Sequence, residues 1–297
     1  MSMVDLQIRS IGTHRAVIGE GPVWSVRDQA LYWLDNTQKK LLRHLPASGS
    51  VEIRDLQYKT SCLALLGDGR LLVAFKKGLA TVDFASGVAQ PLALAGEAPD
   101  FGAALFNDGK VDRAGRLWIG TLDKVPDAAR GALYCIDPAL RVTRAVAGVK
   151  VSNGLAWSPD GRTLYHVDTR PGCIYAMDFD AASATVSNRR PLITYDGGHG
   201  RPDGCTVDAE GYLWVAEIEA SRVSRYAPDG RKDREILLPI TKPTSVMFGG
   251  PDLATLFITS MTFRLDAAEL ERQPWAGTLL ALEPGVRGIA EPVFGLV

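Results

Sequence analysis

The sequence has few cysteines, and none of them lie close together. Its four cysteines, Cys62, Cys135, Cys173 and Cys205, are spread over 297 residues without a CxxC pair. Structural zinc sites usually draw on closely spaced Cys or His pairs, and disulfide frameworks are typical of small secreted domains. The spacing disfavours both, and we expect four reduced thiols in a hydrophobic core.

The chain also lacks an excess of either charge. It has 33 Lys and Arg against 34 Asp and Glu, a formal net charge of -1, and no stretch concentrates basic residues. We therefore expect no nucleic-acid partner, because phosphate binding needs a basic stripe. No segment has the roughly 20 consecutive apolar residues of a membrane span, so no membrane partner is expected. The N-terminal residues MSMVDLQIRSIGTH lack the pattern of a signal peptide, which predicts a cytoplasmic protein.

Helical periodicity is scarce, and a β-type repeat stands in its place. A tight turn followed by a short β-rich run recurs as RDQALYWLD (27–35), GDGRLLVAF (67–75), RAGRLWIGT (113–121), PDGRTLYHVD (159–168), AEGYLWVAE (209–217) and PDLATLFITS (251–260). The spacing, roughly 40 to 50 residues, matches the length of one four-stranded propeller blade. Five tryptophans recur in these units, which indicates packing between blades: Trp24, Trp33, Trp118, Trp157 and Trp214.

The repeat predicts an all-β fold, a six-bladed β-propeller that residues 1–297 form as a single domain. We expect the N-terminal residues LQIRSIG (6–12) to pair with the last blade, because closing the ring leaves few exposed strand edges. An ordinary β-sandwich is the alternative, since its strands also alternate with frequent turns. The long repeat favours the propeller.

Polar residues beside glycines precede or open several of the apolar strands. In a propeller such positions converge on one mouth of the central channel, where ligand sites are common. Glu20, Asn153 and Asp203 there offer three oxygen ligands, which suit Ca²⁺, Mg²⁺ or Mn²⁺; Zn²⁺ and Fe²⁺ remain alternatives. The sequence thus predicts one central site for a divalent metal cation. The simpler interpretation of each Asp or Asn is that of a turn residue.

Four motifs, in order along the chain, carry a resemblance to a known family. They are GEGPVW (19–24), FNDGKVDRAGRLWIGT (106–121), SNGLAWSPDGRTLYHVDT (152–169) and RPDGCTVDAEGYLWVA (201–216). Together they resemble the senescence-marker-protein, gluconolactonase and luciferin-regenerating-enzyme family, which includes regucalcin and bacterial sugar lactonases. The resemblance implies a six-bladed propeller with one divalent metal held by Glu20, Asn153 and Asp203. It also implies that Asn107, with Asp108 beside it, contacts the substrate.

The sequence departs from the family pattern at two places. Leu105 stands where many relatives carry Arg, and GTLDKVPD (120–127) replaces an acidic segment. Substrate contacts carried over from relatives do not apply directly there. Lys124 is a candidate for binding an anionic or strongly hydroxylated substrate, and the alternative is an exposed loop lysine.

The resemblance implies hydrolysis of a sugar lactone, with the metal polarising the carbonyl and Asp203 helping to remove a proton from the attacking water. Asn107 is expected to orient sugar hydroxyls and support the oxyanion. Asp108 is either a brace for that amide or a turn residue before Gly109. His199, in a glycine-rich loop, is the competing base and a further substrate-binding candidate.

Two other classes of function remain as alternatives. One is a non-enzymatic, calcium-binding regulatory protein of the regucalcin type. The other is a protein-interaction scaffold, which predicts a large exposed apolar face and no converging oxygen ligands. We expect a small-molecule sugar lactone as partner and a monomer or weak homo-oligomer. The particular lactone is not readable from loop residues.

Overall fold

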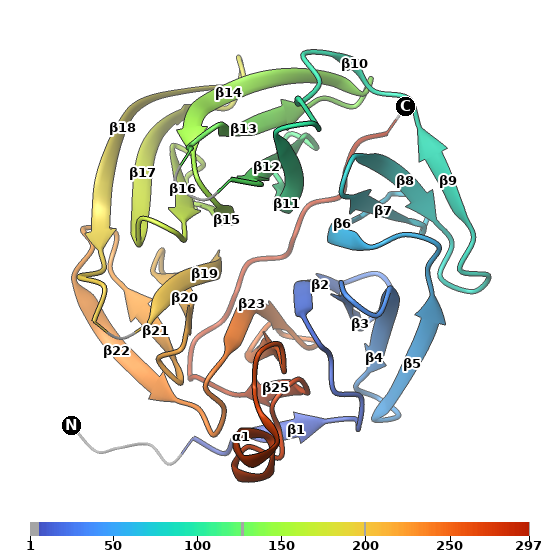
Figure 1. Ribbon diagram of the computed structural model, residues 1–297, viewed down its shortest axis with the longest axis vertical. Coiled ribbons are helices and arrows are strands. Elements are labelled where there is room, and N and C mark those ends of the chain that lie inside the picture. The colour runs from blue at the N-terminus through green and yellow to red at the C-terminus, as the bar shows by residue number, and fades with distance from the viewer. Residues whose placement is uncertain (1–5, 126–127, 199, 297) are drawn as a thin grey trace.

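The computed structural model describes residues 6–125, 128–198 and 200–296. Six sheets, called blades here, are arranged around a common centre (Figure 1). Consecutive strands pair antiparallel within each blade and lead from the centre of the ring to its rim. The prediction of an all-β, six-bladed propeller is confirmed.

The first three blades follow one another along the chain. Blade 1 contains β2 (Gly19–Ser25), β3 (Ala30–Asp35), β4 (Lys40–Leu45) and β5 (Ser50–Asp55). Blade 2 contains β6 (Thr60–Leu65), β7 (Leu71–Phe75), β8 (Gly78–Val82) and β9 (Ala89–Leu92). Blade 3 contains β11 (Ala104–Val111), β12 (Leu117–Asp123), β13 (Gly131–Ile136) and β14 (Arg141–Val149), with β10 (Ala95–Gly96) added in parallel to β14.

Blades 4 to 6 complete the ring. Blade 4 contains β15 (Ser152–Trp157), β16 (Thr163–Asp168), β17 (Cys173–Asp180) and β18 (Thr185–Thr194). Blade 5 contains β19 (Arg201–Val207), β20 (Leu213–Ile218), β21 (Arg222–Tyr226) and β22 (Lys232–Leu237). Blade 6 contains β23 (Pro243–Gly249), β24 (Thr255–Ser260) and β25 (Leu279–Leu282), and β1 (Arg9–Ile11) is its outer strand.

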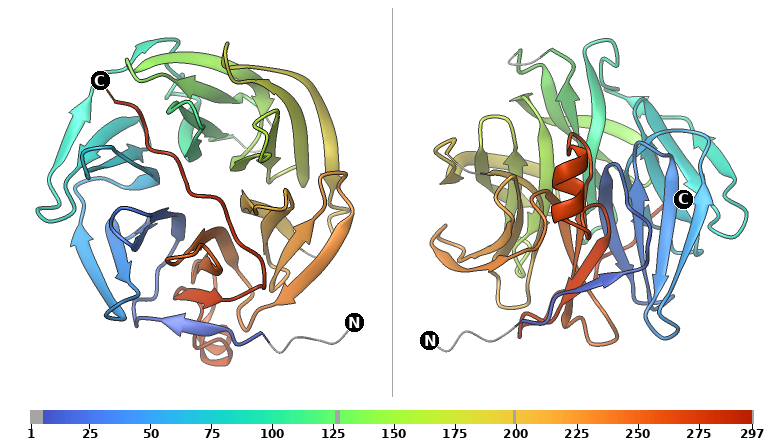
Figure 2. Two further views of the ribbon diagram at one scale, coloured as in Figure 1. Left: turned by 180° about the vertical axis from the view of Figure 1, so that it is seen from behind. Right: turned by 60° about the horizontal axis from the view of Figure 1, so that its bottom comes forward.

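The two ends of the chain hold the ring together. Strand β1 pairs antiparallel with β25, Arg9 opposite Ala281, so the predicted closure by N-terminal residues is confirmed. The C-terminal segment after β25 runs across the ring to blade 2, as the left view of Figure 2 shows. There Phe294 is buried, and its backbone N–H donates to the carbonyl of Leu65.

Apolar side chains fill the space between neighbouring blades. Each hydrophobic cluster combines residues of two adjacent blades; one joins Trp118 and Leu133 of blade 3 to Leu155 and Trp157 of blade 4. Both faces of each inner sheet are therefore buried, and burial of one such leucine stabilises the fold by about 2 kcal/mol. The five repeat tryptophans all lie in this core, and so do the four free cysteines.

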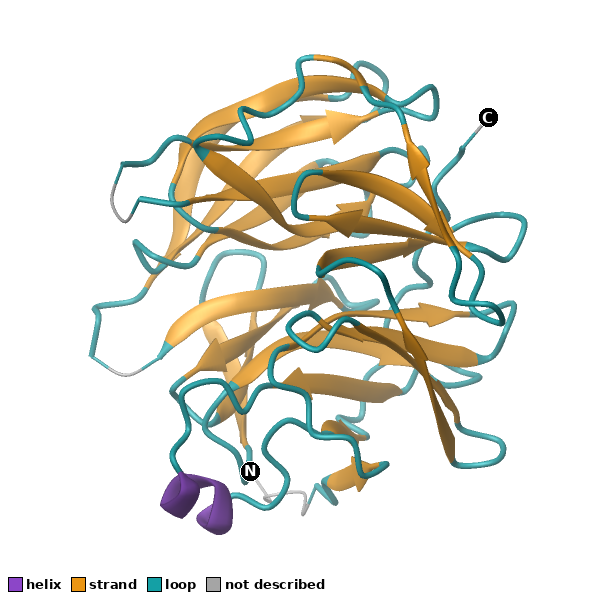
Figure 3. Cartoon of the chain, turned by 45° about the vertical axis from the view of Figure 1, so that its right-hand side comes forward, coloured by secondary structure: helices purple, strands orange, loops and turns teal. Residues whose placement is uncertain are grey.

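A short helix interrupts the otherwise all-β chain (Figure 3). Helix α1 (Ala267–Arg272) is the one helix in the described ranges, and it begins with a capping box between Asp266 and Glu269. The repeat did not predict it, because six residues are too few to produce helical periodicity. Nothing in those ranges is a helix long and apolar enough to cross a membrane.

Candidate active site

All six inner strands contain a β-bulge near their first residues. The pairing with the second strand shifts between Glu20 and Val23, Thr60 and Cys62, Phe106 and Gly109, Asn153 and Leu155, Pro202 and Cys205, and Pro243 and Ser245. A bulge adds an unpaired residue and re-aims its side chain. The ring therefore presents bulge residues from six distant parts of the sequence at one end of the inner strands.

Four of the six bulges contain the carboxylates and amides predicted from the sequence, namely Glu20, Asn107 with Asp108, Asn153 and Asp203. The bulges of blades 2 and 6 contain hydroxyl residues instead. Ser61 donates to the carbonyl of Ala74, and Thr244 donates to that of Gly19. These two hydroxyls satisfy the backbone and leave the acidic groups to the other blades.

The glycines next to the site residues allow the inner strands to approach closely. A Cβ atom on Gly154 would lie 2.5 Å from the backbone oxygen of Asp203, and one on Gly204 would lie 2.1 Å from Oγ of Ser245. No other residue fits at these distances. Gly154 and Gly204 therefore allow β15 to pack closely against β19, and β19 against β23.

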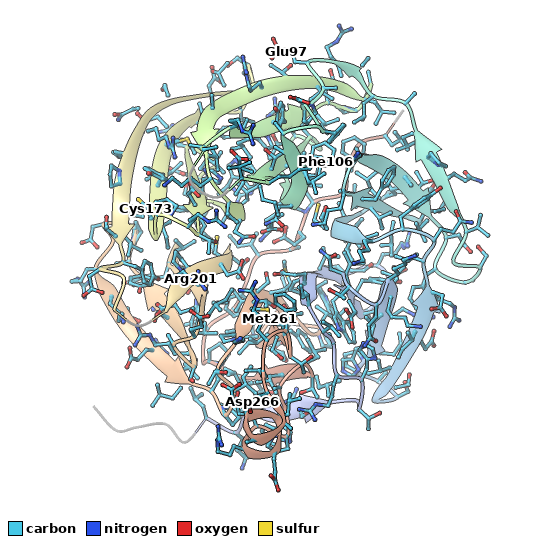
Figure 4. All side chains as sticks on the ribbon, in the orientation of Figure 1. Glu97, Phe106, Cys173, Arg201, Met261 and Asp266 are labelled. Atoms are coloured by element: carbon cyan, nitrogen blue, oxygen red, sulfur yellow. The ribbon has the colours of Figure 1, made fainter. Side chains whose placement is uncertain are left out.

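A cavity of about 300 Å³ opens at this end of the ring. Its walls include Glu20, Asn107, Asp108 and Asn153, together with Lys59 and Lys76. Figure 4 shows the inner-strand side chains around the centre, with Phe106 of blade 3 and Arg201 of blade 5 labelled. Asp203, two residues after Arg201, is 3% exposed and close enough to Glu20 for its charge to raise the pKa of that residue.

Hydrogen bonds fix the orientation of the Asn153 amide. Its Nδ2 donates to Thr169 Oγ1 at 2.8 Å, and that hydroxyl donates to the Pro202 carbonyl at 2.7 Å. The carbonyl oxygen Oδ1 of Asn153 accepts a hydrogen bond from Asn107 Nδ2 at 2.7 Å, and the same nitrogen donates to the Ser152 carbonyl at 2.9 Å. Asn153 therefore presents an oxygen toward Asn107 and the cavity. Thr169 was not singled out from the sequence; it directly follows β16, and the pairing of β15 with β16 brings it to Asn153.

The three acidic groups repel one another. Burial, followed by the charges of Asp203 and Asp108, raises the pKa of Glu20 well above its usual value. Burial and Asp108 raise the pKa of Asp203 in the same way, and burial raises the pKa of Asp108 to about 6. Within the described part of the chain, Oδ1 of Asp203 is buried and has no hydrogen-bond partner. Buried polar oxygens are normally paired, so this arrangement favours a bound cation.

The donor set fits a hard divalent cation. Glu20 and Asp203 supply carboxylate oxygens and Asn153 supplies an amide oxygen, and Ca²⁺, Mg²⁺ and Mn²⁺ prefer oxygen ligands. In the described ranges, no three His, Cys, Asp or Glu side chains converge as metal ligands by themselves. A cation at this place therefore depends on the amide of Asn153 as well as on the two carboxylates.

Of the remaining candidates, Lys124 lies away from the cavity, His199 is not described, and Asp108 has two roles open to it. Lys124 donates to the carbonyls of Phe101 and Gly102 at 2.7 and 3.0 Å, in the loop between β10 and β11. His199 lies outside the described residues. Asp108 accepts a hydrogen bond from the N–H of Gly109 at 2.8 Å, as a turn residue does, and it also lines the cavity.

Several polar residues outside the cavity hold the blades together. His166 is fully buried, and its Nε2 lies 2.8 Å from Ser152 Oγ. Asp168 accepts hydrogen bonds from two backbone N–H groups. Glu217 accepts hydrogen bonds from Tyr195, Tyr226 and Arg222, so it stabilises blade 5 through side chains.

Comparison with known families identifies the architecture. The SMP-30/Gluconolactonase/LRE-like region matches residues 18–262, which contain all six bulges. The chain belongs to this family. It is similar to 6-deoxy-6-sulfogluconolactonase of Pseudomonas putida, with 41% identity over 283 residues, 94% of this chain and 95% of the relative.

Regucalcins are also similar over almost their whole length. Regucalcin of Danio rerio is 35% identical over 291 residues, 97% of this chain and 98% of the relative. The crystal structure of a calcium-binding regucalcin of Agrobacterium tumefaciens superimposes with a TM-score of 0.90 at 30% identity and covers 97% of both chains. The family thus includes proteins named as lactonases and proteins named for calcium binding.

Proposed function

We propose that this protein hydrolyses a sugar-derived lactone to the open aldonic acid, with one divalent cation held by Glu20, Asn153 and Asp203. The observation that carries the proposal is the buried Oδ1 of Asp203, which has no partner among the described residues and lies near a second carboxylate. Membership in a lactonase family and the name of the Pseudomonas putida relative support it.

When bound, a divalent cation polarises the lactone carbonyl and lowers the pKa of water. Asp203, which would hold the cation through its unpaired Oδ1, accepts the proton of the attacking water through its other carboxylate oxygen. The water oxygen adds to the carbonyl carbon, the bond to the ring oxygen breaks, and the proton passes to the leaving hydroxyl. The products are one carboxylate and one proton for each lactone.

The role of Asn107 follows from its hydrogen bonds. Both hydrogens of its Nδ2 are occupied, one by Asn153 Oδ1 and one by the Ser152 carbonyl. Its own Oδ1 is the atom left to contact the substrate, so Asn107 accepts a hydrogen bond from a sugar hydroxyl. This role keeps the expected orientation of sugar hydroxyls by Asn107.

A pH-indicator assay on γ- and δ-lactones tests the proposal. The protein is stripped of metal and reconstituted with Ca²⁺, Mg²⁺, Mn²⁺, Zn²⁺ or Fe²⁺, and spontaneous hydrolysis is subtracted. The panel contains gluconolactone and 6-deoxy-6-sulfogluconolactone. The variants are Asp203→Asn and Asn153→Ala, and the control is Asp229→Asn, an exposed turn residue on blade 5. We expect metal-restored turnover that both site variants lose and the control keeps.

The alternative is a calcium-binding regulatory protein, which the similarity to regucalcins favours. It predicts that the same site binds a cation while no lactone in the panel is hydrolysed above the spontaneous rate. That result would exclude the lactonase proposal and retain the metal site.

A further inference from the structure

Two lysines of blade 2 lie side by side at the edge of the cavity. Lys59 directly precedes β6, and Lys76 directly follows β7. Because Thr60 and Phe75 are cross-strand partners, the two lysines continue that pair beyond the ladder. Both line the same cavity as Glu20 and Asn107. Neither appears in a motif of the inner strands, so the sequence analysis did not single them out.

The two ammonium groups have almost no partners within the protein. Lys76 makes one long hydrogen bond, 3.5 Å, to the Phe106 carbonyl. In the described ranges neither lysine forms an ion pair with a carboxylate, and Lys59 has no hydrogen bond. An ammonium group has three donors, so most of this capacity remains for a ligand. By contrast, Lys110, deeper in the ring, pairs with Glu291 of the C-terminal segment at 3.1 Å.

Burial and mutual repulsion both disfavour the charged form of Lys76 beside Lys59. Lys76 is partly buried, and burial lowers its pKa, whereas the charge of Glu20 raises it. The neighbouring charge of Lys59 adds repulsion. Two like charges beside each other, one of them partly desolvated, favour the binding of an anion between them.

The ring places these lysines across from the proposed base. Blade 2 and blade 5 face each other through the centre of the six-membered ring, as Figure 1 shows for β6 and β19. Asp203 lies in β19 of blade 5, close enough to the cavity-lining Glu20 for its charge to act on that residue, and the lysines line the cavity from blade 2. A substrate whose carbonyl lies near Asp203 therefore directs its far end toward the lysines.

We propose that Lys59 and Lys76 form a subsite for an anionic substituent, a carboxylate or sulfonate, at the end of the sugar lactone away from the ring carbonyl. This inference rests on the proposed lactonase function and names the substrate class within it. The lysines contribute binding of the substituent and take no part in the proton transfer.

Steady-state kinetics with paired substrates test the subsite. The neutral substrate is glucono-1,5-lactone, and the anionic substrates are 6-deoxy-6-sulfogluconolactone and glucaro-1,4-lactone, which separate sulfonate from carboxylate recognition. The variants are Lys59→Met and Lys76→Met. The matched control is Lys77→Met, because Lys77 is the exposed neighbour of Lys76 and is not part of the cavity wall.

We expect each subsite variant to lose about tenfold in kcat/KM on its preferred anionic lactone, which corresponds to about 1.4 kcal/mol of binding. The loss is expected in KM, because the substituent is bound equally before and during the reaction. For Lys59→Met and Lys76→Met, kcat/KM on the neutral glucono-1,5-lactone should change less than about twofold. For Lys77→Met, kcat/KM on every substrate should also change less than about twofold, which is the effect expected of losing an exposed charge. The subsite would be overturned if the ratio of kcat/KM for the anionic lactone to kcat/KM for the neutral lactone stayed the same in both lysine variants as in the wild type.

A binding measurement separates this inference from the proposed reaction. Calorimetry compares 6-deoxy-6-sulfo-D-glucose and D-glucuronate with D-glucose, none of which is a lactone. Lysine-dependent binding of an anionic sugar, without hydrolysis of any lactone, supports the subsite and rejects the reaction. Hydrolysis of neutral lactone, with no preference for anionic sugars in binding or kinetics, supports the reaction and rejects the subsite.

Discussion

Asp203 and Asp208, five residues apart in blade 5, are both buried and have opposite surroundings. Asp208 accepts four hydrogen bonds, from two backbone N–H groups of the following turn, from Trp214 Nε1 and from Arg225 Nε. Asp203 leaves Oδ1 without a partner in the described ranges. Donors of its own blade satisfy the carboxylate of Asp208, whereas they leave one carboxylate oxygen of Asp203 without a hydrogen bond.

Blade 3 repeats the same contrast. Asp112 accepts hydrogen bonds from Trp118 Nε1, from Arg116 Nε and from two backbone N–H groups. Asp108, four residues earlier, has one hydrogen bond, from Gly109. In blades 3 and 5 the acid at the bulge end of the inner strand thus has few hydrogen-bond donors, and the acid at the turn end has four. Burial alone does not distinguish these two kinds of acid; the number of donors does.

The largest effect should come from exchanging the two aspartates of blade 5 for asparagine. Asp208→Asn leaves Arg225 paired with Glu210 and Asp233, but the asparagine amide nitrogen cannot accept the hydrogen bonds of one carboxylate oxygen, so buried donors lose their partner. We expect a loss of about 3 kcal/mol in stability, measured by urea unfolding. Asp203→Asn removes a charge that repels Glu20 and Asp108, so the metal-free protein should keep its stability. Its lactone turnover should fall at least about 100-fold, the typical contribution of a general base.

The two variants serve as controls for each other. Folded Asp208→Asn should retain turnover, because Asp208 lies beyond the turn end of β19 and both its oxygens are bound by donors of blade 5. If Asp203→Asn and Asp208→Asn lost stability and turnover to the same extent, the proposed difference between the acid at the bulge end and the acid at the turn end would be wrong.

The next effect concerns the cation. An ion that binds only the folded protein stabilises it by about 2.7 kcal/mol at a concentration 100-fold above its Kd. We expect this gain in thermal unfolding of the wild type and of Asp208→Asn, and no gain in Asp203→Asn. A comparable gain in Asp203→Asn would place the cation elsewhere.

A smaller effect should follow from widening the contact between β15 and β19. In Gly154→Ala the new Cβ meets the backbone oxygen of Asp203, so one strand must shift, at a cost of about 2 kcal/mol. The shift should also weaken cation binding. Gly67→Ala is the control, because the Cβ that alanine adds there would have no atom within 4 Å, and its effect should stay within about 0.5 kcal/mol. Unchanged cation affinity in Gly154→Ala would show that the close approach does not position Asp203.

The ring could be predicted from the sequence because the repeat is long and local. Each unit encodes its own turn and strands, as in RAGRLWIGT (113–121), and six units of this length form a closed propeller. The parallel strand β10 and helix α1 escaped prediction, since each is too short for a periodic pattern. The capping box of α1 was the one local signal, in Asp266 and Glu269.

Candidate site residues could be predicted only from polar residues in glycine-containing motifs. Glu20, Asn107, Asn153 and Asp203 were predicted in this way. Thr169 directly follows β16 and bonds Asn153 of the paired strand β15, and Lys59 and Lys76 lie together only through the register of β6 and β7. Contacts of that kind depend on strand pairing, which the letters of a motif do not record. Lys124 was chosen by its neighbours in sequence, and the structure directs its ammonium group to loop carbonyls.

The smallest effect should appear in the pH dependence of stability, through His166, a buried group that lies outside the cavity wall. Burial, followed by the charge of Arg189, lowers the pKa of His166 to about 3. The unfolded chain binds a proton near its usual pKa of about 6.5 and the folded chain does not. The contribution of His166 to stability is therefore complete above pH 6.5 and is lost as the pH falls toward 3, by about 1.4 kcal/mol per pH unit. His166→Gln, measured by urea unfolding between pH 7 and pH 5.5, where the loss amounts to about 1.4 kcal/mol, should flatten that slope. Parallel slopes in the two proteins would assign the acid sensitivity to other groups.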